Sequence, residues 1–221
     1  ATSSEGSDVK TMKRSLITAF VLISLIFCTA ASADNLVAIE YYNRGVDLAY
    51  EGNHPEALAS INRALEENSN FTLALATKAG ILNALGQYRE AIDVADRALA
   101  IDPGEAAAWN NKAFALNQLG RYEDALNAAD AAVSLDPDMT EGWVNKGSSL
   151  IGIGSYEEAL AASEEALSRD PTSSQAAQNR DIATRFLSPT PTVAAVEGWV
   201  LIPGAILAGI LLKLTGTRKR K

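Results

Sequence analysis

Cysteine and histidine are almost absent from this sequence, since Cys28 and His54 are the only residues of their types among 221. A lone cysteine forms no disulfide within the chain and offers thiol chemistry no second sulfur. A lone histidine cannot assemble a metal-ligand cluster, and we expect His54, just before Pro55, to be a solvated loop residue. These scarcities exclude a disulfide framework and a histidine-based metal centre.

Basic residues are scarce in the middle of the chain. Residues 38–173 contain 22 Asp+Glu and 9 Lys+Arg, a net charge of −13, against −8 for the whole chain. Such a body repels phosphate backbones, so we expect no nucleic-acid partner.

Sequence motifs for catalysis are also absent. The chain has no phosphate-binding glycine loop and no nucleophile elbow. Paired carboxylates occur at Glu66-Glu67, Glu157-Glu158 and Glu164-Glu165, and we expect all of them on exposed helix faces. The sequence therefore predicts a protein that is not an enzyme and that has no cofactor.

The N-terminal region has the pattern of a secretory signal peptide. Met12-Lys13-Arg14 is a basic start, 16–31 is a largely apolar run without charge, and Ala31-Ser32-Ala33 is a small-residue cleavage site. We predict a signal peptide over 12–33, preceded by a polar, disordered extension over 1–11. An uncleaved signal anchor is the alternative.

The C-terminal region has the pattern of a membrane anchor. A Pro/Thr linker over 188–197 precedes a mostly apolar segment over 198–214, with Trp199 and Lys213 near its ends, and a basic tail over 215–221. We predict a transmembrane helix and, from the positive tail, a cytoplasmic C-terminus. The protein would then be a single-pass cell-membrane protein whose body is extracytoplasmic. A buried core helix or a processed sorting signal are alternatives for the apolar segment.

Between these ends the sequence repeats every 34 residues. Such a period indicates stacked copies of one supersecondary unit. We place the units at 38–71, 72–105, 106–139 and 140–173. Three series keep the spacing: Gly86, Gly120 and Gly154; Tyr88, Tyr122 and Tyr156; and the Asp-Pro pairs that begin at Asp102, Asp136 and Asp170.

Each unit has the pattern of a helix, a turn and a second helix. Over 106–119 apolar residues recur at 3–4 spacing, Gly120 then favours a left-handed turn, and helical spacing resumes over 123–136. Pro137 ends the second helix. Small side chains at the repeated alanines allow close helix contact, and each repeated tyrosine can lie over the next helix pair. The alanines are Ala57, Ala91, Ala125 and Ala159, and Ala64, Ala98, Ala132 and Ala166.

The pattern Trp143-x-x-x-Gly147-x-x-Leu150 … Gly154-x-Tyr156-x-x-Ala159 … Ala166 … Pro171 resembles the tetratricopeptide repeat (TPR). The resemblance covers all four units and implies an all-α, right-handed α-solenoid. It also implies a capping helix over 174–187, with Ala177, Ile182 and Phe186 as its apolar residues and Gln175, Gln178, Asn179 and Arg180 facing water. The repeats and the tail are loosely similar to those of surface TPR proteins of methanogenic archaea.

In this family the first helices of the repeats line a concave groove that binds extended peptides or short helices. Asn43, Thr77, Asn111 and Asn145 recur at one groove position, where they either hold a peptide backbone or only tie neighbouring helices together. The family's basic clamp for a C-terminal carboxylate is absent. We call the series Asn43, Thr77, Asn111 and Asn145 the ladder, and we expect Lys78, Lys112 and Lys146 to flank it or pair with acidic neighbours. The groove residues that the resemblance implies are Tyr42, Asn43, Val46, Thr77, Asn83, Asn110, Asn111, Phe114, Asn117, Asn145 and Ser148.

The sequence therefore predicts a non-enzymatic scaffold that binds a peptide or helix of a partner protein at the outer face of a membrane. The alternative is an assembly factor or non-catalytic subunit of a cell-envelope enzyme.

Overall fold

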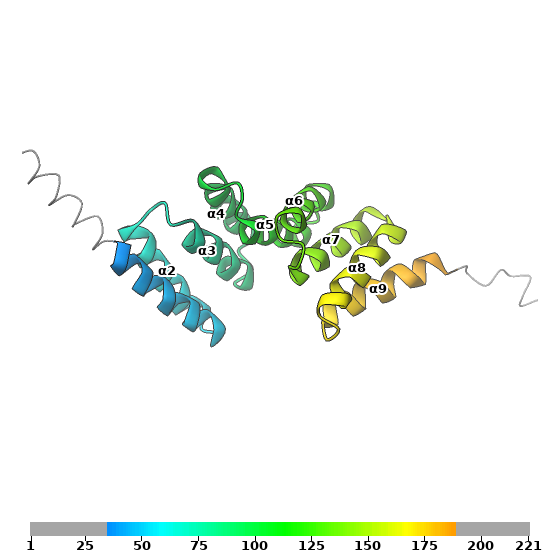
Figure 1. Ribbon diagram of the computed structural model, residues 1–221, viewed down its shortest axis with the longest axis horizontal. Helices are drawn as coiled ribbons and strands as arrows, with labels where there is room; N and C mark the ends of the chain where they lie inside the picture. Colours follow the sequence, from blue (N-terminus) through cyan, green and yellow to red (C-terminus); the bar gives the residue numbers. More distant parts are fainter. Residues whose placement is uncertain (1–34, 189–221) are drawn as a thin grey trace, which may run out of the picture.

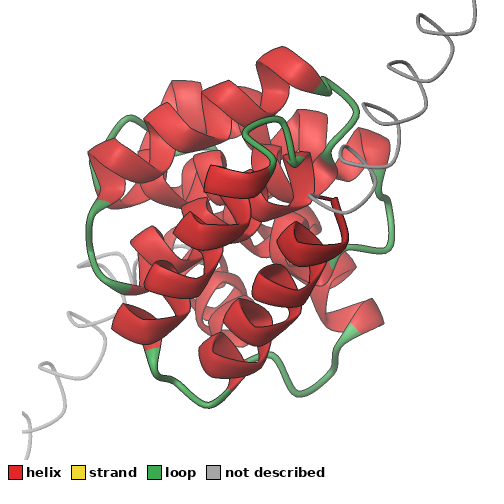
Figure 2. Cartoon of the chain, turned by 90° about the vertical axis from the view of Figure 1, so that its left-hand side faces the viewer, coloured by secondary structure: helices red, strands yellow, loops and turns green. Residues whose placement is uncertain are grey.

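A computed structural model describes residues 35–188, and this part of the chain consists of helices and loops without strands (Figure 2). In Figure 1 the helices form an arched row that runs from α2 on the left to α9 on the right. A helix over 35–50 comes first. The others are α2 (His54–Glu67), α3 (Thr72–Ala84), α4 (Tyr88–Ile101), α5 (Ala106–Gln118), α6 (Tyr122–Leu135), α7 (Thr140–Ile153), α8 (Tyr156–Arg169) and α9 (Ser174–Leu187).

The helices pack in a one-dimensional order. From α2 onward each helix contacts the next one in the chain. The helix over 35–50 pairs with α2, α3 with α4, α5 with α6 and α7 with α8. The first helices of these pairs also contact one another, α3 with α5 and α5 with α7, and α7 contacts α9. Among these helices no contact reaches further along the row. This is the all-α solenoid of helix–turn–helix repeats that the sequence predicts.

The turn inside each pair depends on a left-handed glycine. Gly120 has φ +72, a conformation in which other residues are strained. Its turn lets the backbone N–H of Arg121 donate to the carbonyl of Leu116 at 3.0 Å, which satisfies the end of α5. Positive φ angles recur at Gly52, Gly86 and Gly154.

The connection between pairs depends on the Asp-Pro signal. Asp136 follows the last residue of α6, and its Oδ1 accepts a hydrogen bond from the backbone N–H of Asp138 at 3.1 Å. Such a turn, together with the missing N–H of Pro137, ends the helix. The next first helix then begins two residues after Asp138, at Thr140.

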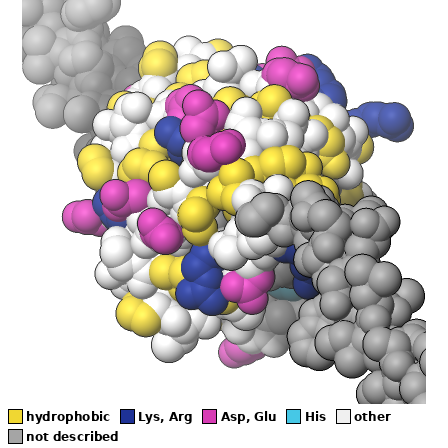
Figure 3. All heavy atoms as spheres, turned by 90° about the vertical axis from the view of Figure 1, so that its right-hand side faces the viewer, with side chains coloured by type: hydrophobic (Ala, Val, Ile, Leu, Met, Phe, Trp, Pro, Cys, Tyr) yellow, Lys and Arg dark blue, Asp and Glu magenta, His cyan; other side chains and the backbone are white. Residues whose placement is uncertain are grey.

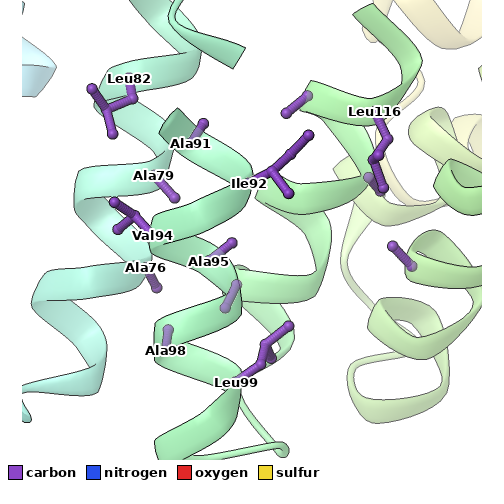
Figure 4. Close-up of a cluster of buried hydrophobic side chains, with 14 of the residues drawn as sticks. Ala76, Ala79, Leu82, Ala91, Ile92, Val94, Ala95, Ala98, Leu99 and Leu116 are labelled. Atoms are coloured by element: carbon purple, nitrogen blue, oxygen red, sulfur yellow. The ribbon is translucent and has the colours of Figure 1, made fainter. Parts of the chain in front are cut away.

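Alanine fills the helix contacts. Figure 4 shows how Ala76, Ala79, Ala95 and Ala98 of α3 and α4 occupy the space between the two helices. Side chains of this size let helices approach closely, as the sequence predicts, and larger ones would overpack the contact. The repeated alanines Ala57, Ala64, Ala91, Ala98, Ala125, Ala132, Ala159 and Ala166 are all 0% exposed.

Each repeated tyrosine lies against the first helix of the next pair, as predicted. Tyr88 lies near Phe114, with ring centroids 6.3 Å apart, and Tyr122 lies against Gly152. Tyr156 stacks on Phe186 of α9 at 4.4 Å.

Two expectations about side-chain exposure are wrong. His54 is not a solvated loop residue but the first residue of α2, where it is partly buried, because a proline after it is well suited to a helix start. In α9, Asn179 is 3% exposed instead of facing water, whereas Phe186 is 62% exposed. Ala176 and Ala183 are the buried apolar residues of α9, and Phe186, although exposed, stacks on Tyr156 of the last pair. Figure 3 shows exposed hydrophobic side chains beside charged ones at the α9 end of the row.

The predicted extension over 1–11, the signal peptide over 12–33, the apolar segment over 198–214 and the basic tail lie outside the described residues. Within 35–188, every helix is too short or too polar to cross a bilayer.

Candidate functional site

Two adjoining hollows lie along the first helices of the pairs. The larger, about 530 Å³, extends from α3 across α5 and α7 to the start of α9. The smaller, about 360 Å³, lies between the helix over 35–50, the start of α2 and α3. Gly80 and Ala84 of α3 line both of them, so the two hollows form one groove.

The residues of α3 that line both hollows have small side chains. A Cβ atom built on Gly80 would meet only the carboxamide of Asn111, at 3.4 Å, which is ordinary van der Waals contact. One turn along the same helix, Ala84 is exposed. The equivalent positions of α5 carry Phe114 and Gln118, so a large aromatic side chain stands beside the space that α3 leaves open.

The structure places ten of the eleven predicted groove residues along this groove. Asn43, the eleventh, is exposed but lines neither hollow. Asn83, Asn110, Asn111, Phe114, Asn117, Asn145 and Ser148 line the larger hollow, and Tyr42, Val46 and Thr77 line the smaller.

The ladder asparagines are engaged with the preceding pair. Nδ2 of Asn111 donates to the carbonyl of Ala76 at 2.9 Å. Nδ2 of Asn145 donates to the side-chain oxygen of Asn110 at 2.7 Å and to its carbonyl at 3.4 Å. Asn179 of α9 continues the series, donating to the carbonyl of Val144 at 3.1 Å. The sequence leaves two roles open for the ladder, to hold a peptide backbone or to tie neighbouring helices together. These amides tie neighbouring helices together.

A second set of asparagines ties the same helices in the opposite direction. Nδ2 of Asn83 donates to the carbonyl of Asn111 at 2.8 Å, and Nδ2 of Asn117 donates to the carbonyl of Asn145 at 3.0 Å. Each junction, α3 to α5 and α5 to α7, thus carries amide hydrogen bonds from both sides. These neutral hydrogen bonds tie α3 to α5 and α5 to α7 along the groove.

The charged side chains of the groove are acidic. Glu141 and Asp170 line the larger hollow. Hydrogen bonds from the side chain and then the backbone N–H of Thr172 hold the pKa of Asp170 below its ordinary value of 3.8, so this carboxylate is ionised at neutral pH.

Two of the three repeated lysines pair with acidic neighbours, as expected, and none of the three lines either hollow. Nζ of Lys112 lies 2.5 Å from Oδ1 of Asp96, and Nζ of Lys146 lies 2.7 Å from Oδ1 of Asp130. Each also lies over the ring of the tryptophan three residues before it, at 5.4 and 5.3 Å. Lys78 has Asn62 at the position equivalent to these aspartates.

Sequence reasoning missed several residues of the groove wall. Gln118 lies one helical turn beyond the predicted Phe114, and Ala84 is its equivalent 34 residues earlier, so a longer periodic count finds both. Asp170 and Ser173 belong to the loop before α9, and no periodic signal marks them as groove residues. Among residues 35–188 no three His, Cys, Asp or Glu side chains gather closely enough to hold a metal ion.

Comparison with known families and structures identifies the repeat. A tetratricopeptide repeat family model matches residues 48–113 and 82–146, and a second model of the same repeat matches residues 140–173. Together the matches extend over 48–173, more than half of the chain. No curated protein sequence matches this chain.

Solved structures share the fold. A MamA protein is 19% identical, with a TM-score of 0.57, over 68% of this chain and 82% of its own. MamA from Desulfovibrio magneticus RS-1 is 22% identical, with a TM-score of 0.55, over 68% and 90%. The first TPR domain of the human RPAP3 protein is 25% identical, with a TM-score of 0.50, over 52% and 91%.

Proposed function

The chain belongs to the tetratricopeptide repeat family, and from that premise we propose that its groove binds a peptide segment or a short helix of a partner protein. Members of this family typically mediate protein–protein interactions and are non-catalytic scaffolds. The observation that carries the proposal is the single groove formed by the two hollows that meet at Gly80 and Ala84. A preformed groove lowers the entropic cost of holding an extended ligand.

Filling the groove tests this function. Ala84→Trp places a large side chain where the two hollows meet, and Ala100→Trp makes the same change on an exposed residue of α4 that lines neither hollow. The purified 221-residue chain and both variants are used as bait in extracts of the source cells, and bound proteins are identified by mass spectrometry. We expect Ala84→Trp to lose the partner and Ala100→Trp to keep it. Equal recovery by both variants would contradict binding in the groove.

The recovered proteins also distinguish two forms of the function. A recruiting scaffold would yield several proteins that lose binding together in Ala84→Trp. One partner in a fixed one-to-one ratio would instead favour an assembly factor or a non-catalytic subunit of a cell-envelope enzyme.

For location we propose that the groove faces outward from a cell membrane. The support is sequence pattern alone: the signal-peptide pattern over 12–33, the apolar segment over 198–214 and the four basic residues at 218–221. Protease added to intact cells should then digest the repeats while leaving the C-terminal tail protected. Full protection of the repeats, with digestion only after lysis, would overturn this orientation.

A further inference from the structure

The asparagine ties decide which hydrogen-bonding groups the groove still offers. Nδ2 of Asn83, Asn111 and Asn117 each faces a backbone carbonyl, which accepts only, so these contacts fix the amide orientation. Each of these amides therefore uses one of its two N–H donors within the chain. Oδ1 of Asn117 accepts a hydrogen bond from the hydroxyl of Ser149 at 2.9 Å, so the acceptors still open to a ligand are those of the other amides.

Asn83 carries the clearest unused acceptor. The residue is 7% exposed, lines the larger hollow, and its Oδ1 has no hydrogen-bond partner within residues 35–188. A buried polar atom without a partner costs about 1–3 kcal/mol. This oxygen is itself buried, so a ligand donor could use it only by displacing the side chains that cover it. Oδ1 of Asn111 and of Asn145 also accept no hydrogen bond from the described part of the chain.

The charged side chains of the groove also favour a ligand with hydrogen-bond donors. Glu141 and Asp170 are acidic, and no lysine or arginine of the described residues lines either hollow. An acceptor-rich, negatively charged wall favours ligands with N–H donors and positive charge. It disfavours a C-terminal carboxylate, which finds no lysine or arginine of the described residues there.

The other half of the groove is apolar. Tyr42, Val46, Ala49 and Ile81 line the smaller hollow, and Tyr50 beside them is 89% exposed. An exposed aromatic side chain at the edge of an apolar hollow gains by packing against a second apolar group.

We propose that the groove selects a segment with lysine or arginine over the α5–α7 half and a large apolar side chain over the half formed by the helix at 35–50 and α3. The proposal rests on the proposed function and names its ligand class. Neighbouring helices pack ~10 Å apart and an extended chain spans ~3.3 Å per residue, so a segment of about twelve residues crosses the groove.

A random peptide library of that length, panned on the purified 221-residue chain, tests the proposal. Enriched peptides are synthesised and their affinities measured by fluorescence anisotropy for the unmodified chain, Ala84→Trp, Glu141→Lys and Glu157→Lys. Glu157 is the matched control, because both glutamates are the second residue of their helix, but only Glu141 lines the groove.

We expect the enriched peptides to be basic at one end and apolar at the other, with few acidic residues. Glu141→Lys should weaken their binding about three- to tenfold, and Glu157→Lys should change it less than about twofold. Added salt should weaken binding to the unmodified chain as well.

The possible failures are distinguishable. Enrichment of acidic or uncharged peptides that lose binding to Ala84→Trp would overturn the basic–apolar preference and leave groove binding intact. Equal weakening by Glu141→Lys and Glu157→Lys would show only an effect of net charge and would also overturn it. If no enriched peptide is sensitive to Ala84→Trp, the proposed function itself is wrong.

Discussion

Two glycines of the first helices differ in what their missing side chains allow. A Cβ atom on Gly152 of α7 would overlap the ring of Tyr122, whereas the same atom on Gly80 would meet only Asn111 at 3.4 Å. The overlap involves ring atoms near the root of the tyrosine side chain, so the ring cannot move aside without leaving its place between two pairs. Packing against Tyr122 therefore requires a glycine at position 152. The glycine at position 80 instead leaves space in the groove.

Alanine substitutions should separate these roles. We expect Gly152→Ala to lower the free energy of unfolding by about 1–3 kcal/mol, because overpacking outweighs the ~0.5–1 kcal/mol that a helix gains from replacing glycine. Gly80→Ala should be neutral or slightly stabilising. Urea titration followed by circular dichroism measures both, and equal effects of the two changes would contradict the assignment.

Asp170 gives a second prediction for single residues. Its pKa is lowered first by the hydroxyl of Thr172, at 2.6 Å, and then by the backbone N–H of the same residue. Thr172→Val removes the hydroxyl, so the pKa should rise toward 3.8 without reaching it, and Thr172→Ser should retain the lowered value. Carboxyl chemical shifts in an NMR pH titration report the change.

The sign of the pH effect follows from the direction of this shift. A lowered folded-state pKa means that the ionised carboxylate stabilises the turn above the unfolded-state pKa, and that this stabilisation is lost as pH falls through the folded-state value. The unmodified chain should therefore resist acid to a lower pH than Thr172→Val. Identical acid unfolding of the two would show that the turn contributes nothing to acid stability.

At the scale of helices, amide hydrogen bonds between first helices hold the row together. Asn145 is 6% exposed and donates to Asn110 of the preceding pair, whereas Asn43, at the same position of the first repeat, is exposed. The same side chain in the same register thus has a structural role in one repeat that it does not have in another.

We expect Asn145→Ala to lower the free energy of unfolding by about 1–3 kcal/mol, because it removes two hydrogen bonds to Asn110 from a buried site. Asn43→Ala is the control and should change that free energy by less than about 0.5 kcal/mol. Thermal and urea unfolding measure the difference. A large effect at Asn43 would mean that the ladder position matters for helix propensity rather than for ties between pairs.

At the scale of the whole molecule, contacts are confined to neighbours along the row. Among the described helices α9 touches only α7 and α8. Stability in such an array is a sum of unit and interface contributions, so a disturbance at one end stays local.

Removing α9 tests this locality. A chain that ends after Thr172 should lose hydrogen-exchange protection mainly in α7 and α8, where the contacts of Ala176, Asn179 and Ala183 are lost. A chain that ends after Ser188 is the control, because it retains α9. Equal loss of protection in α3 and α4 would show instead that the row unfolds as one cooperative unit.

Much of the fold follows from local signals. Left-handed glycines such as Gly120 and the Asp-Pro turns act on their own backbone, so their spacing predicts helix–turn–helix units without any tertiary information. The groove depends less on local signals. Family register indicates which positions face the groove, but Asp170 reaches it only because a loop passes beside α7.

The sequence by itself determined the 34-residue period, the helical pairs and the positions of the small alanines. The period is visible in the residues themselves, and each helix and turn depends on neighbours within one or two turns. Only the tertiary structure decided that Asn111 and Asn145 donate to the preceding pair, that Asn179 is buried, and that Gly80 and Ala84 leave a continuous groove. These features join residues about one repeat apart, and the distance between their atoms is set by how the helices pack, which no local pattern of a single chain specifies.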